Sequence, residues 1–287
     1  MDTFTLNLAK RALPTLSFSK TTVETSSLHH AHPIFGFPFA VGNTATLYYH
    51  DKKAIKLFNP RSPKDEARRE YNKHAYAYSL KVSTPKVDHV RVIDHQQALV
   101  MDYVEGQPLG EKSVHSPEAL ISGLTTAIQL QQHLHQIPLK EVNQMEQLRT
   151  KIKKQIQSVE EVSIQKRSEL TLRLDDLSKT SLCLCHGDFH FLNILSTKAG
   201  NVIIDWVDAS IGDQLADVCR SYLLYTNHSQ ALGELYLRLY CAASGDSEDA
   251  ILKWLPILAC ARLAEQVPSD DSDRLFQMIY TDPFNLI

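Results

Sequence analysis

The chain has 287 residues, and 43% of them are hydrophobic. This length is enough for one large domain or two smaller lobes, and the apolar fraction allows a sizeable buried core. The 33 acidic and 30 basic residues give a formal charge of −3, and no basic run stands out. Composition therefore excludes a general electrostatic attraction to nucleic acid or to anionic lipid.

Neither a targeting segment nor a membrane span is evident in the sequence. The N-terminal residues MDTFTLNLAK lack the apolar stretch of a signal peptide, and no apolar run approaches the length that spans a bilayer. Five cysteines at irregular spacing favour reduced thiols over a disulfide framework. We therefore expect a cytoplasmic protein. The cysteines are Cys183, Cys185, Cys219, Cys241 and Cys260.

Strand patterns dominate the first third of the chain, after a stretch of mixed signals over residues 1–35. Alternating or continuous apolar runs favour β-strands, and short polar turns separate these runs. A break at residues 105–108, with the sequence EGQP, ends this part of the chain. The expected strands are residues 37–42, 44–49, 52–58, 89–94 and 97–103.

One helix is expected between the third and fourth of these strands. Ser62 and Asp65 have the spacing of a capping box, and Pro63 suits the first helical position. Apolar and aromatic residues then recur at helical spacing from residue 67 to residue 78, and Pro85 closes the element.

The remainder of the chain is mostly helical. Ser116 and Pro117 open one helix, residues 141–178 favour a helical hairpin, and helical patterns continue from Asp213 to the end. The chain is therefore expected to be an α+β protein, with a β-rich lobe over residues 1–103 and a larger helical lobe over residues 104–287. Short strands are expected within the helical lobe at residues 181–185, 193–196 and 201–205.

The strongest chemical signal is the loop His186-Gly187-Asp188, followed by Asn193 and, twelve residues later, by Asp205. A strand precedes the loop and a hairpin joins Asn193 to Asp205, so we expect the three oxygen-bearing side chains to lie together. In phosphoryl transfer one carboxylate orients the attacking hydroxyl and accepts its proton, while an amide oxygen and a second carboxylate hold Mg²⁺. The alternative is a loop in which Asp and Asn only make turns.

The patterns HGDxxxxN and IDWxxxxxGDxxxD resemble the signature of the aminoglycoside phosphotransferases and their relatives, which include choline kinases and other small-molecule kinases. The resemblance implies a bilobal protein-kinase-like fold. A small antiparallel-sheet N-lobe would bind the nucleotide, and a mostly helical C-lobe would carry the catalytic loop and the acceptor pocket. The resemblance further implies that Asp188 is the catalytic base, that Asn193 and Asp205 are metal ligands, and that Asp217 is structural.

Lys56 lies in an apolar strand and resembles the strand lysine that binds the α- and β-phosphates of a nucleotide. Its expected partner is a glutamate on the following helix. Glu70 borders the inward stripe of that helix and is favoured, and Glu66, one turn earlier, is the alternative. A solvated lysine at a sheet edge is the plainer interpretation of the same pattern.

Two further segments are expected to contact the nucleotide. The turn Gly42-Asn43-Thr44 lies between two strands, where backbone N–H groups can contact phosphate, although a single glycine makes a weak motif. Residues 99–106 resemble an interlobe hinge. Backbone groups near Asp102, Tyr103 and Val104 would hydrogen-bond adenine, and Met101 either faces the base or packs in the core.

These observations predict an ATP-dependent phosphotransferase that uses Mg²⁺ and a small-molecule hydroxyl acceptor. GTP in place of ATP, the acceptor itself and the oligomeric state stay open. A protein kinase of similar fold is an alternative, but the segment between Asp205 and Asp213 is too short for a peptide platform. A nucleotide-binding regulator without catalysis is the other alternative, and the intact Asp188 and Lys56 argue against it.

Overall fold

The computed structural model covers the whole chain and describes residues 2–16, 31–42, 44–177, 182–268 and 270–281. Its packing divides the chain into two compact units, each of which is described by itself. Both units join stretches that are distant in the sequence, whereas the two expected lobes are contiguous stretches. The sheet unit comprises Ser17–Lys112 and Leu192–Asp208, and the helical unit comprises Met1–Leu16, Ser113–Phe191 and Ala209–Ile287.

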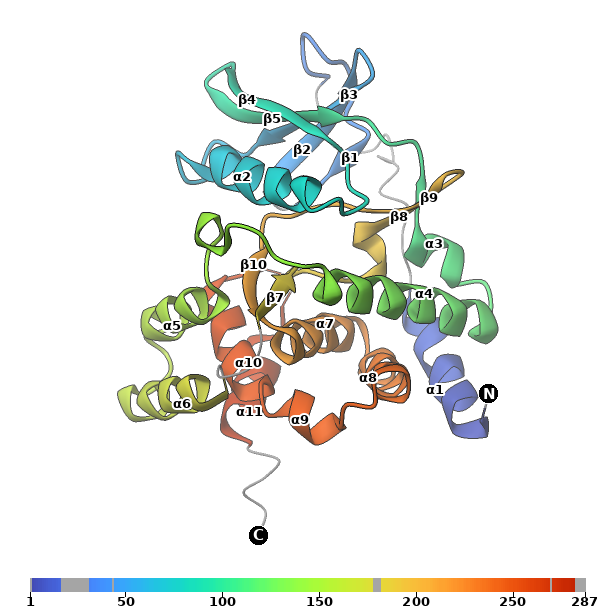
Figure 1. Cartoon of the computed structure of the whole chain (residues 1–287), viewed down its shortest axis with the longest axis vertical. Helices are drawn as coiled ribbons and strands as arrows, with labels where there is room; N and C mark the ends of the chain where they lie inside the picture. The colour runs from blue at the N-terminus through green and yellow to red at the C-terminus, as the bar shows by residue number, and fades with distance from the viewer. Residues whose placement is uncertain (1, 17–30, 43, 178–181, 269, 282–287) are drawn as a thin grey trace. The chain divides into compact units, whose positions relative to one another are not determined.

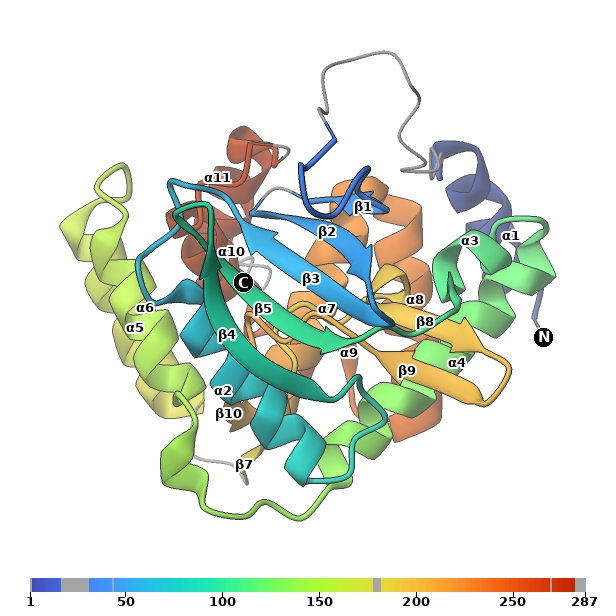
Figure 2. The same ribbon diagram turned by 90° about the horizontal axis from the view of Figure 1, so that it is seen from above.

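The sheet unit is built on a five-stranded antiparallel sheet with the strand order β1-β2-β3-β5-β4 (Figure 2). Helix α2 (Glu66–Ser79) follows β3 in the chain and lies along one face of this sheet (Figure 1). The five strands expected from alternating apolar residues are all present. They are β1 (Ala40–Val41), β2 (Ala45–His50), β3 (Lys53–Phe58), β4 (Val87–Ile93) and β5 (Gln96–Asp102).

Because side chains alternate between the two faces of the sheet, its buried hydrophobic residues form two separate cores, one on each face. Ala54 of β3 packs in one core with Ala67 of α2. Ile55 packs in the other core with Val100 of β5. Because successive side chains of a strand point to opposite faces, Lys56 lies on the same face as Ala54, which is the face that α2 covers.

The start of α2 differs from the expectation. The helix begins at Glu66, and Asp65 occupies the N-cap position without a capping hydrogen bond from its side chain. Oδ2 of Asp65 instead accepts a hydrogen bond from Nε of Arg69 at 2.8 Å. Ser62 and Pro63 lie in the turn before the helix, so the predicted capping box at Ser62 is wrong.

A second, three-stranded sheet completes the sheet unit. Its strands β8 and β9 form a hairpin, and at the open end of that hairpin the N–H of Ile204 donates to the carbonyl oxygen of Asn193 at 3.0 Å. Asn193 directly precedes β8 and Asp205 directly follows Ile204, so the two flank this open end. The strands are β6 (Gln107–Pro108), β8 (Ile194–Thr197) and β9 (Gly200–Ile203).

The helical unit surrounds a short antiparallel pair, β7 (Leu182–Cys185) and β10 (Ser210–Asp213) (Figure 1). Helix α4 starts as expected, because the Ser116 hydroxyl accepts a hydrogen bond from the N–H of Ala119 and Pro117 follows at the first turn. The main helices are α4 (Pro117–Gln136), α5 (Leu148–Ser158), α6 (Ile164–Leu177), α7 (Gln214–His228), α8 (Gln230–Ser244), α9 (Glu248–Leu252), α10 (Leu255–Ala264) and α11 (Ser272–Tyr280).

The first helix, α1 (Thr3–Ala12), also belongs to the helical unit and packs against α4 and α8. Leu8, Ala9 and Ala12 on its inner face are at most 2% exposed. Nε of Arg238 on α8 donates a hydrogen bond to Oγ1 of Thr5 at 3.0 Å. The start of the ambiguous stretch therefore forms a helix with a buried inner face.

The five cysteines are free, and Cys183 and Cys185 are buried thiols whose sulfur atoms lie 3.8 Å apart. Among the described residues, no three His, Cys, Asp or Glu side chains are grouped so as to hold a metal ion. Within the same described ranges, no helix has both the length and the apolar character needed to cross a membrane.

Candidate active site

Lys56 of β3 is the centre of a buried ion cluster in the sheet unit. Its Nζ lies 2.8 Å from Oε1 of Glu70 on α2 and 2.9 Å from Oδ1 of Asp205. Burial disfavours the ammonium, but the carboxylates of Asp205 and Glu70 outweigh that effect and raise the pKa of Lys56 above its ordinary value. The lysine is therefore an inward, charged group and not a solvated residue at a sheet edge.

Glu70, and not Glu66, is the carboxylate that pairs with Lys56. Burial raises the pKa of Glu70 to about 7, although the charge of Lys56 acts in the opposite direction. The second oxygen, Oε2, is buried and has no hydrogen-bond partner among the described residues. Because an unpaired buried oxygen is costly, Glu70 depends on Lys56 to remain ionised.

Asp205 has a backbone conformation that L-residues seldom adopt, with φ at +64°. Such a conformation costs about 1 kcal/mol or more, and it persists where the surrounding structure holds it, often at functional sites. The side chain is 38% exposed while one of its oxygens contacts Lys56. The carboxylate therefore keeps lone pairs that a cation from solvent can reach.

Asn193 and Asp205 flank the open end of the β8–β9 hairpin, where a backbone hydrogen bond joins their neighbouring peptide groups. An amide oxygen and a carboxylate are hard oxygen donors of the kind that Mg²⁺ prefers, and Mg²⁺ completes its shell with phosphate and water oxygens. The donor set at this end of the hairpin therefore fits Mg²⁺.

In the segment expected to bind adenine, backbone hydrogen bonds within the protein already use some of the candidate N–H groups. The N–H groups of Asp102 and Tyr103 donate to backbone carbonyl oxygens within the sheet unit, at 2.9 and 3.1 Å. The amide of Val104 makes no backbone hydrogen bond among the described residues, so its N–H is available to an outside acceptor. Met101 is 8% exposed and packs in the same core as Ala54.

The turn expected to cover the phosphates is only partly suited to that task. The N–H of Gly42 donates to the carbonyl oxygen of Ala45 at 2.9 Å and so is not available to a phosphate. A Cβ added at Gly42 would meet only that carbonyl oxygen, at 3.5 Å, so the position does not require glycine. Asn43 lies outside the described residues, and Thr44 is the remaining candidate.

In the helical unit, helix α7 fixes the backbone just before Asp188. Gly187 has φ at +79°, a region that favours glycine. Its N–H donates to Oδ1 of Asp217 at 2.8 Å, and its carbonyl oxygen accepts a hydrogen bond from Nε of Arg220 at 3.1 Å. Both peptide groups of Gly187 are thus held by one helix face.

Asp217 is itself fixed from α4. It is 2% exposed, and its Oδ2 contacts Nε2 of His135 at 2.9 Å and accepts a hydrogen bond from Nε2 of Gln131 at 3.2 Å. Burial acts to raise the pKa of Asp217, but the hydrogen bonds from His135 and from the Gly187 N–H outweigh it and lower the pKa. These contacts support a structural role for Asp217.

Arg220 connects the loop to the far side of the helical unit. Its Nη2 lies 2.6 Å from Oε2 of Glu265, and Nη1 of Arg262 lies 2.7 Å from the same oxygen. Nε2 of Gln155 donates to the other oxygen of Glu265 at 3.1 Å. This network holds the guanidinium of Arg220 in the orientation in which Nε meets Gly187.

Asp188 directly follows Gly187, whose N–H and carbonyl oxygen are both held by α7. Burial acts to raise its pKa, but the positive field of His190, Arg220 and His186 outweighs burial and holds the pKa of Asp188 well below its usual range. The carboxyl is therefore ionised at neutral pH, as a base must be. Asp188 belongs to the helical unit, whereas Asn193 and Asp205 belong to the sheet unit.

A family model described as the phosphotransferase enzyme family matches residues 38–254. The chain belongs to this family. The matched stretch includes the strand of Lys56, the loop of Asp188 and the hairpin of Asn193 and Asp205. No curated protein sequence is similar enough to count as a match.

Solved structures similar to this phosphotransferase share its fold at low sequence identity. A thermostable mutant of aminoglycoside phosphotransferase APH(4)-Ia, in a ternary complex with ADP and hygromycin B, has a TM-score of 0.59 and 14% identity; the match covers 85% of this chain and 88% of that chain. A choline/ethanolamine kinase family protein from Mesorhizobium loti has a TM-score of 0.56 and 15% identity, with 96% of each chain covered.

Aminoglycoside phosphotransferase APH(3'')-Id from Streptomyces rimosus, in complex with ADP and streptomycin, is also similar, with a TM-score of 0.56 and 16% identity over 75% of this chain and 90% of that chain. These likenesses confirm the expected α+β, protein-kinase-like fold, with its small antiparallel sheet and its larger helical part.

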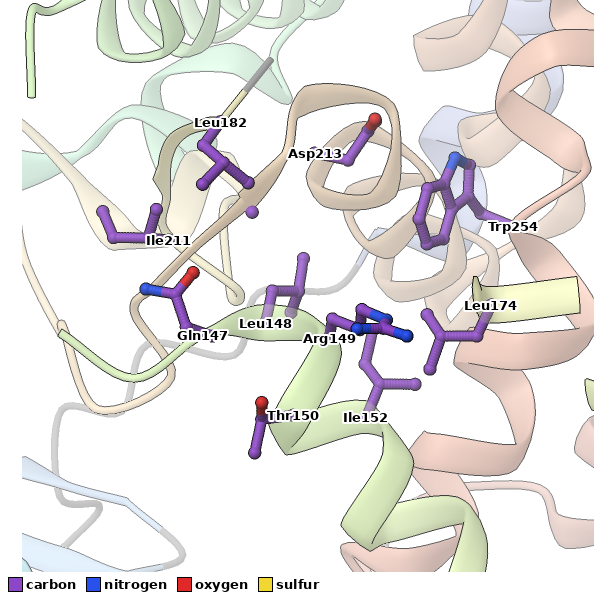
Figure 3. Close-up of a pocket in the computed structure, with 11 residues that line it drawn as sticks. Gln147, Leu148, Arg149, Thr150, Ile152, Leu174, Leu182, Ile211, Asp213 and Trp254 are labelled. Atoms are coloured by element: carbon purple, nitrogen blue, oxygen red, sulfur yellow. The ribbon is translucent and has the colours of Figure 1, made fainter. Parts of the chain in front are cut away.

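The helical unit of the phosphotransferase also contains a separate cavity of about 260 Å³ (Figure 3). Its walls come from α5, α6, β10 and the residues around them, and the Trp254 side chain closes one side. None of the residues expected to bind nucleotide, metal or acceptor proton lines it. The lining residues are Gln147, Leu148, Arg149, Thr150, Ile152, Leu174, Leu182, Ile211, Gly212, Asp213 and Trp254.

Sequence reasoning missed the residues that hold the loop of this phosphotransferase. Arg220 has a weak signal, because it lies one helical turn after Asp217 on the same face of a helix. Gln131 and His135 have no such sequence signal, because they are 86 and 82 residues away from Asp217 and no local pattern marks them.

Proposed function

We propose that the chain transfers the γ-phosphoryl group of ATP to a hydroxyl of a small molecule, with Mg²⁺ as cofactor. The observation that carries this proposal is the buried Lys56 between Glu70 and Asp205. Burial of an ion cluster gives little stability by itself, because desolvation offsets the attraction between the charges. A buried ammonium held in place by two carboxylates is well suited to neutralise the α- and β-phosphates of a nucleotide.

The remaining residues take the other parts of the reaction. Asp188, ionised at neutral pH, accepts the proton of the acceptor hydroxyl. Asn193 and Asp205 would hold Mg²⁺, which when bound would neutralise charge on the phosphate oxygens. The Val104 amide donates a hydrogen bond to the base. Asp205 stays fixed by Lys56, which in turn is oriented by Glu70.

The small-molecule acceptor is supported by the family and by the chain's own layout. Two of the similar solved structures bind hygromycin B and streptomycin, which carry hydroxyl groups. Only seven residues separate Asp205 from Asp213, where α7 follows directly, so little chain is available to bind a peptide substrate.

The test is ADP release from Mg²⁺-ATP over a panel of hydroxyl-bearing compounds, including aminoglycosides, choline and other amino alcohols, with GTP as a second nucleotide. We expect ADP formation that depends on one compound class and on Mg²⁺, and a phosphorylated product in the mass spectrum. Asp188→Asn should abolish turnover while nucleotide binding persists. Tight nucleotide binding without turnover on the whole panel, or phosphorylation of protein substrates alone, would contradict the proposal.

A further inference from the structure

His190 lies two residues after Asp188 in the same loop, and the two side chains face each other. Nε2 of His190 is 3.5 Å from Oδ2 of Asp188. The side chains are 19% and 23% exposed, so the pair is largely shielded from water. A contact of this length in the absence of substrate is typical of catalytic hydrogen bonds, which tighten when the substrate binds.

The backbone around His190 is fixed from α7. The next residue, Phe191, is 1% exposed, and its N–H donates to the hydroxyl of Tyr225 at 3.0 Å. The rings of Phe191 and Tyr225 lie 5.1 Å apart. The other side of Asp188 is held through Gly187, as described above. The imidazole of His190 is therefore set beside the carboxylate by anchors on both sides of the loop.

A carboxylate that acts as a base has to present one oxygen to the hydroxyl. The last torsion of an Asp side chain has a broad, two-fold energy profile, so the carboxylate turns freely unless a donor holds one oxygen. Nε of the neighbouring Arg220 donates to the Gly187 carbonyl, and its Nη2 contacts Glu265. Nε2 of His190 is placed to hold Oδ2.

We propose that His190 is a positioning residue for Asp188: its Nε2–H donates to Oδ2 and so helps to fix the orientation in which the carboxylate meets the acceptor hydroxyl. The inference rests on the proposed function. As the new oxygen–phosphorus bond forms and the bond to the leaving ADP breaks, the hydroxyl proton moves to the Asp188 carboxylate and then to water. His190 keeps its own proton throughout and forms no bond to phosphorus.

The first test compares His190→Ala, His190→Gln and His115→Ala by the rate of ADP release, with water as acceptor and with the best compound of the panel. We expect His190→Ala to lower kcat by about 10- to 100-fold with KM for ATP within about twofold, because a misplaced base slows the chemical step and leaves nucleotide binding intact. His190→Gln, which retains an N–H donor, should recover most of the loss. Added imidazole should partly restore His190→Ala. The exposed His115 in the same unit serves as the control.

The second test needs no turnover. In protein labelled with ¹⁵N-histidine, we expect the His190 ring to carry its proton on Nε2, and its resonances to shift in Asp188→Ala but not in Asp249→Ala. Equal kcat for His190→Ala and wild type, or a His190→Gln variant as slow as His190→Ala, overturns the proposal. A wild-type chain that releases no ADP contradicts the proposed function instead, and the ¹⁵N spectrum still decides whether His190 holds Asp188.

Discussion

The ammonium of Lys56 and the carboxylate of Glu70 are 2.8 Å apart, and the two residues are 7% and 1% exposed. The pair joins β3 to α2, fourteen residues further along the chain. Nζ of Lys56 contacts Asp205 at the same time. In the proposed function, Glu70 therefore acts on the nucleotide through the lysine that it orients.

We expect Glu70→Gln to raise KM for ATP by about 5- to 20-fold. The reason is the loss of a charge-assisted hydrogen bond, worth about 1–2 kcal/mol, that orients Lys56. Glu66→Gln, one turn earlier on the same helix, is the matched control and should leave KM within about twofold. Steady-state kinetics at saturating acceptor measure both values. A larger effect in Glu66→Gln than in Glu70→Gln would contradict the assignment.

The unfolding free energy of the nucleotide-free chain should depend on pH through the titration of Glu70. Its pKa is raised from 4.5 to about 7 in the folded chain, so its contribution to stability is present in acid and is lost as the pH rises towards about 7. We expect the unfolding free energy of Glu70→Gln to gain on wild type by up to about 3 kcal/mol between pH 5 and pH 8. Urea titrations across that range test it, and parallel curves would refute it.

Asp217 should show the opposite dependence on pH. Its pKa is lowered in the folded chain, so its contribution to stability is present at neutral pH and is lost as the pH falls below the ordinary Asp range. We expect Asp217→Asn to lower the unfolding free energy by about 3 kcal/mol at pH 7 and by less at pH 3.5, because a buried, fully partnered carboxylate is lost. Asp213→Asn is the control, since Asn also caps helices well; equal losses in both variants would be the contrary result.

Arg220→Lys should slow turnover without weakening nucleotide binding. A lysine has no fork of N–H groups with which to meet both the Gly187 carbonyl and Glu265. We expect kcat to fall about 10-fold while KM for ATP stays within about twofold. Arg274→Lys is the matched control, because the hydrogen bonds of Arg274 go to Thr226 and Asn227 and not to the loop. Unchanged kcat in Arg220→Lys would show that turnover does not depend on the contacts of Arg220 with Gly187 and Glu265.

Asp205→Asn should remove the effect of Mg²⁺ on nucleotide affinity. We expect wild type to bind ATP at least about 10-fold more tightly with Mg²⁺ than with EDTA, and the variant to bind equally in both. Asn tolerates positive φ, so the backbone at this position should survive the change. Asp94→Asn is the control, since Asp94 also has positive φ but lies exposed in another turn. Calorimetric titration gives the four affinities, and a Mg²⁺ effect that persists in Asp205→Asn would exclude the metal assignment.

The periodicity of apolar residues predicted those parts of the fold and of the site that depend on neighbouring residues in the sequence. The strands follow from alternation, and Lys56 and Glu70 each lie on a local apolar stripe that fixes which way they point. The start of α2 was not predictable in the same way. Ser62 and Asp65 both suit a helix start, and in the structure the Asp65 carboxylate contacts Arg69 and does not cap the helix.

The residues that support the loop before Asp188 could not be predicted from the sequence for a different reason. His135 meets Asp217 across 82 residues, and Arg220 meets Gly187 across 33. Such contacts exist only once α4 and α7 have packed, and neither helix has a periodicity that marks these polar residues for the interior. The pair of His190 and Asp188 is close in sequence, yet its contact is between two side chains whose directions no local periodicity marks.

Helix α1 has a practical consequence for preparing this protein. It lies outside the stretch that matches the family, residues 38–254, and so do α10 and α11. Expressing only the matched stretch would strip α1 from α4 and α8 and leave Arg238 without Thr5. The bared apolar surface would favour aggregation, so a soluble preparation needs the first helix as part of the expressed chain.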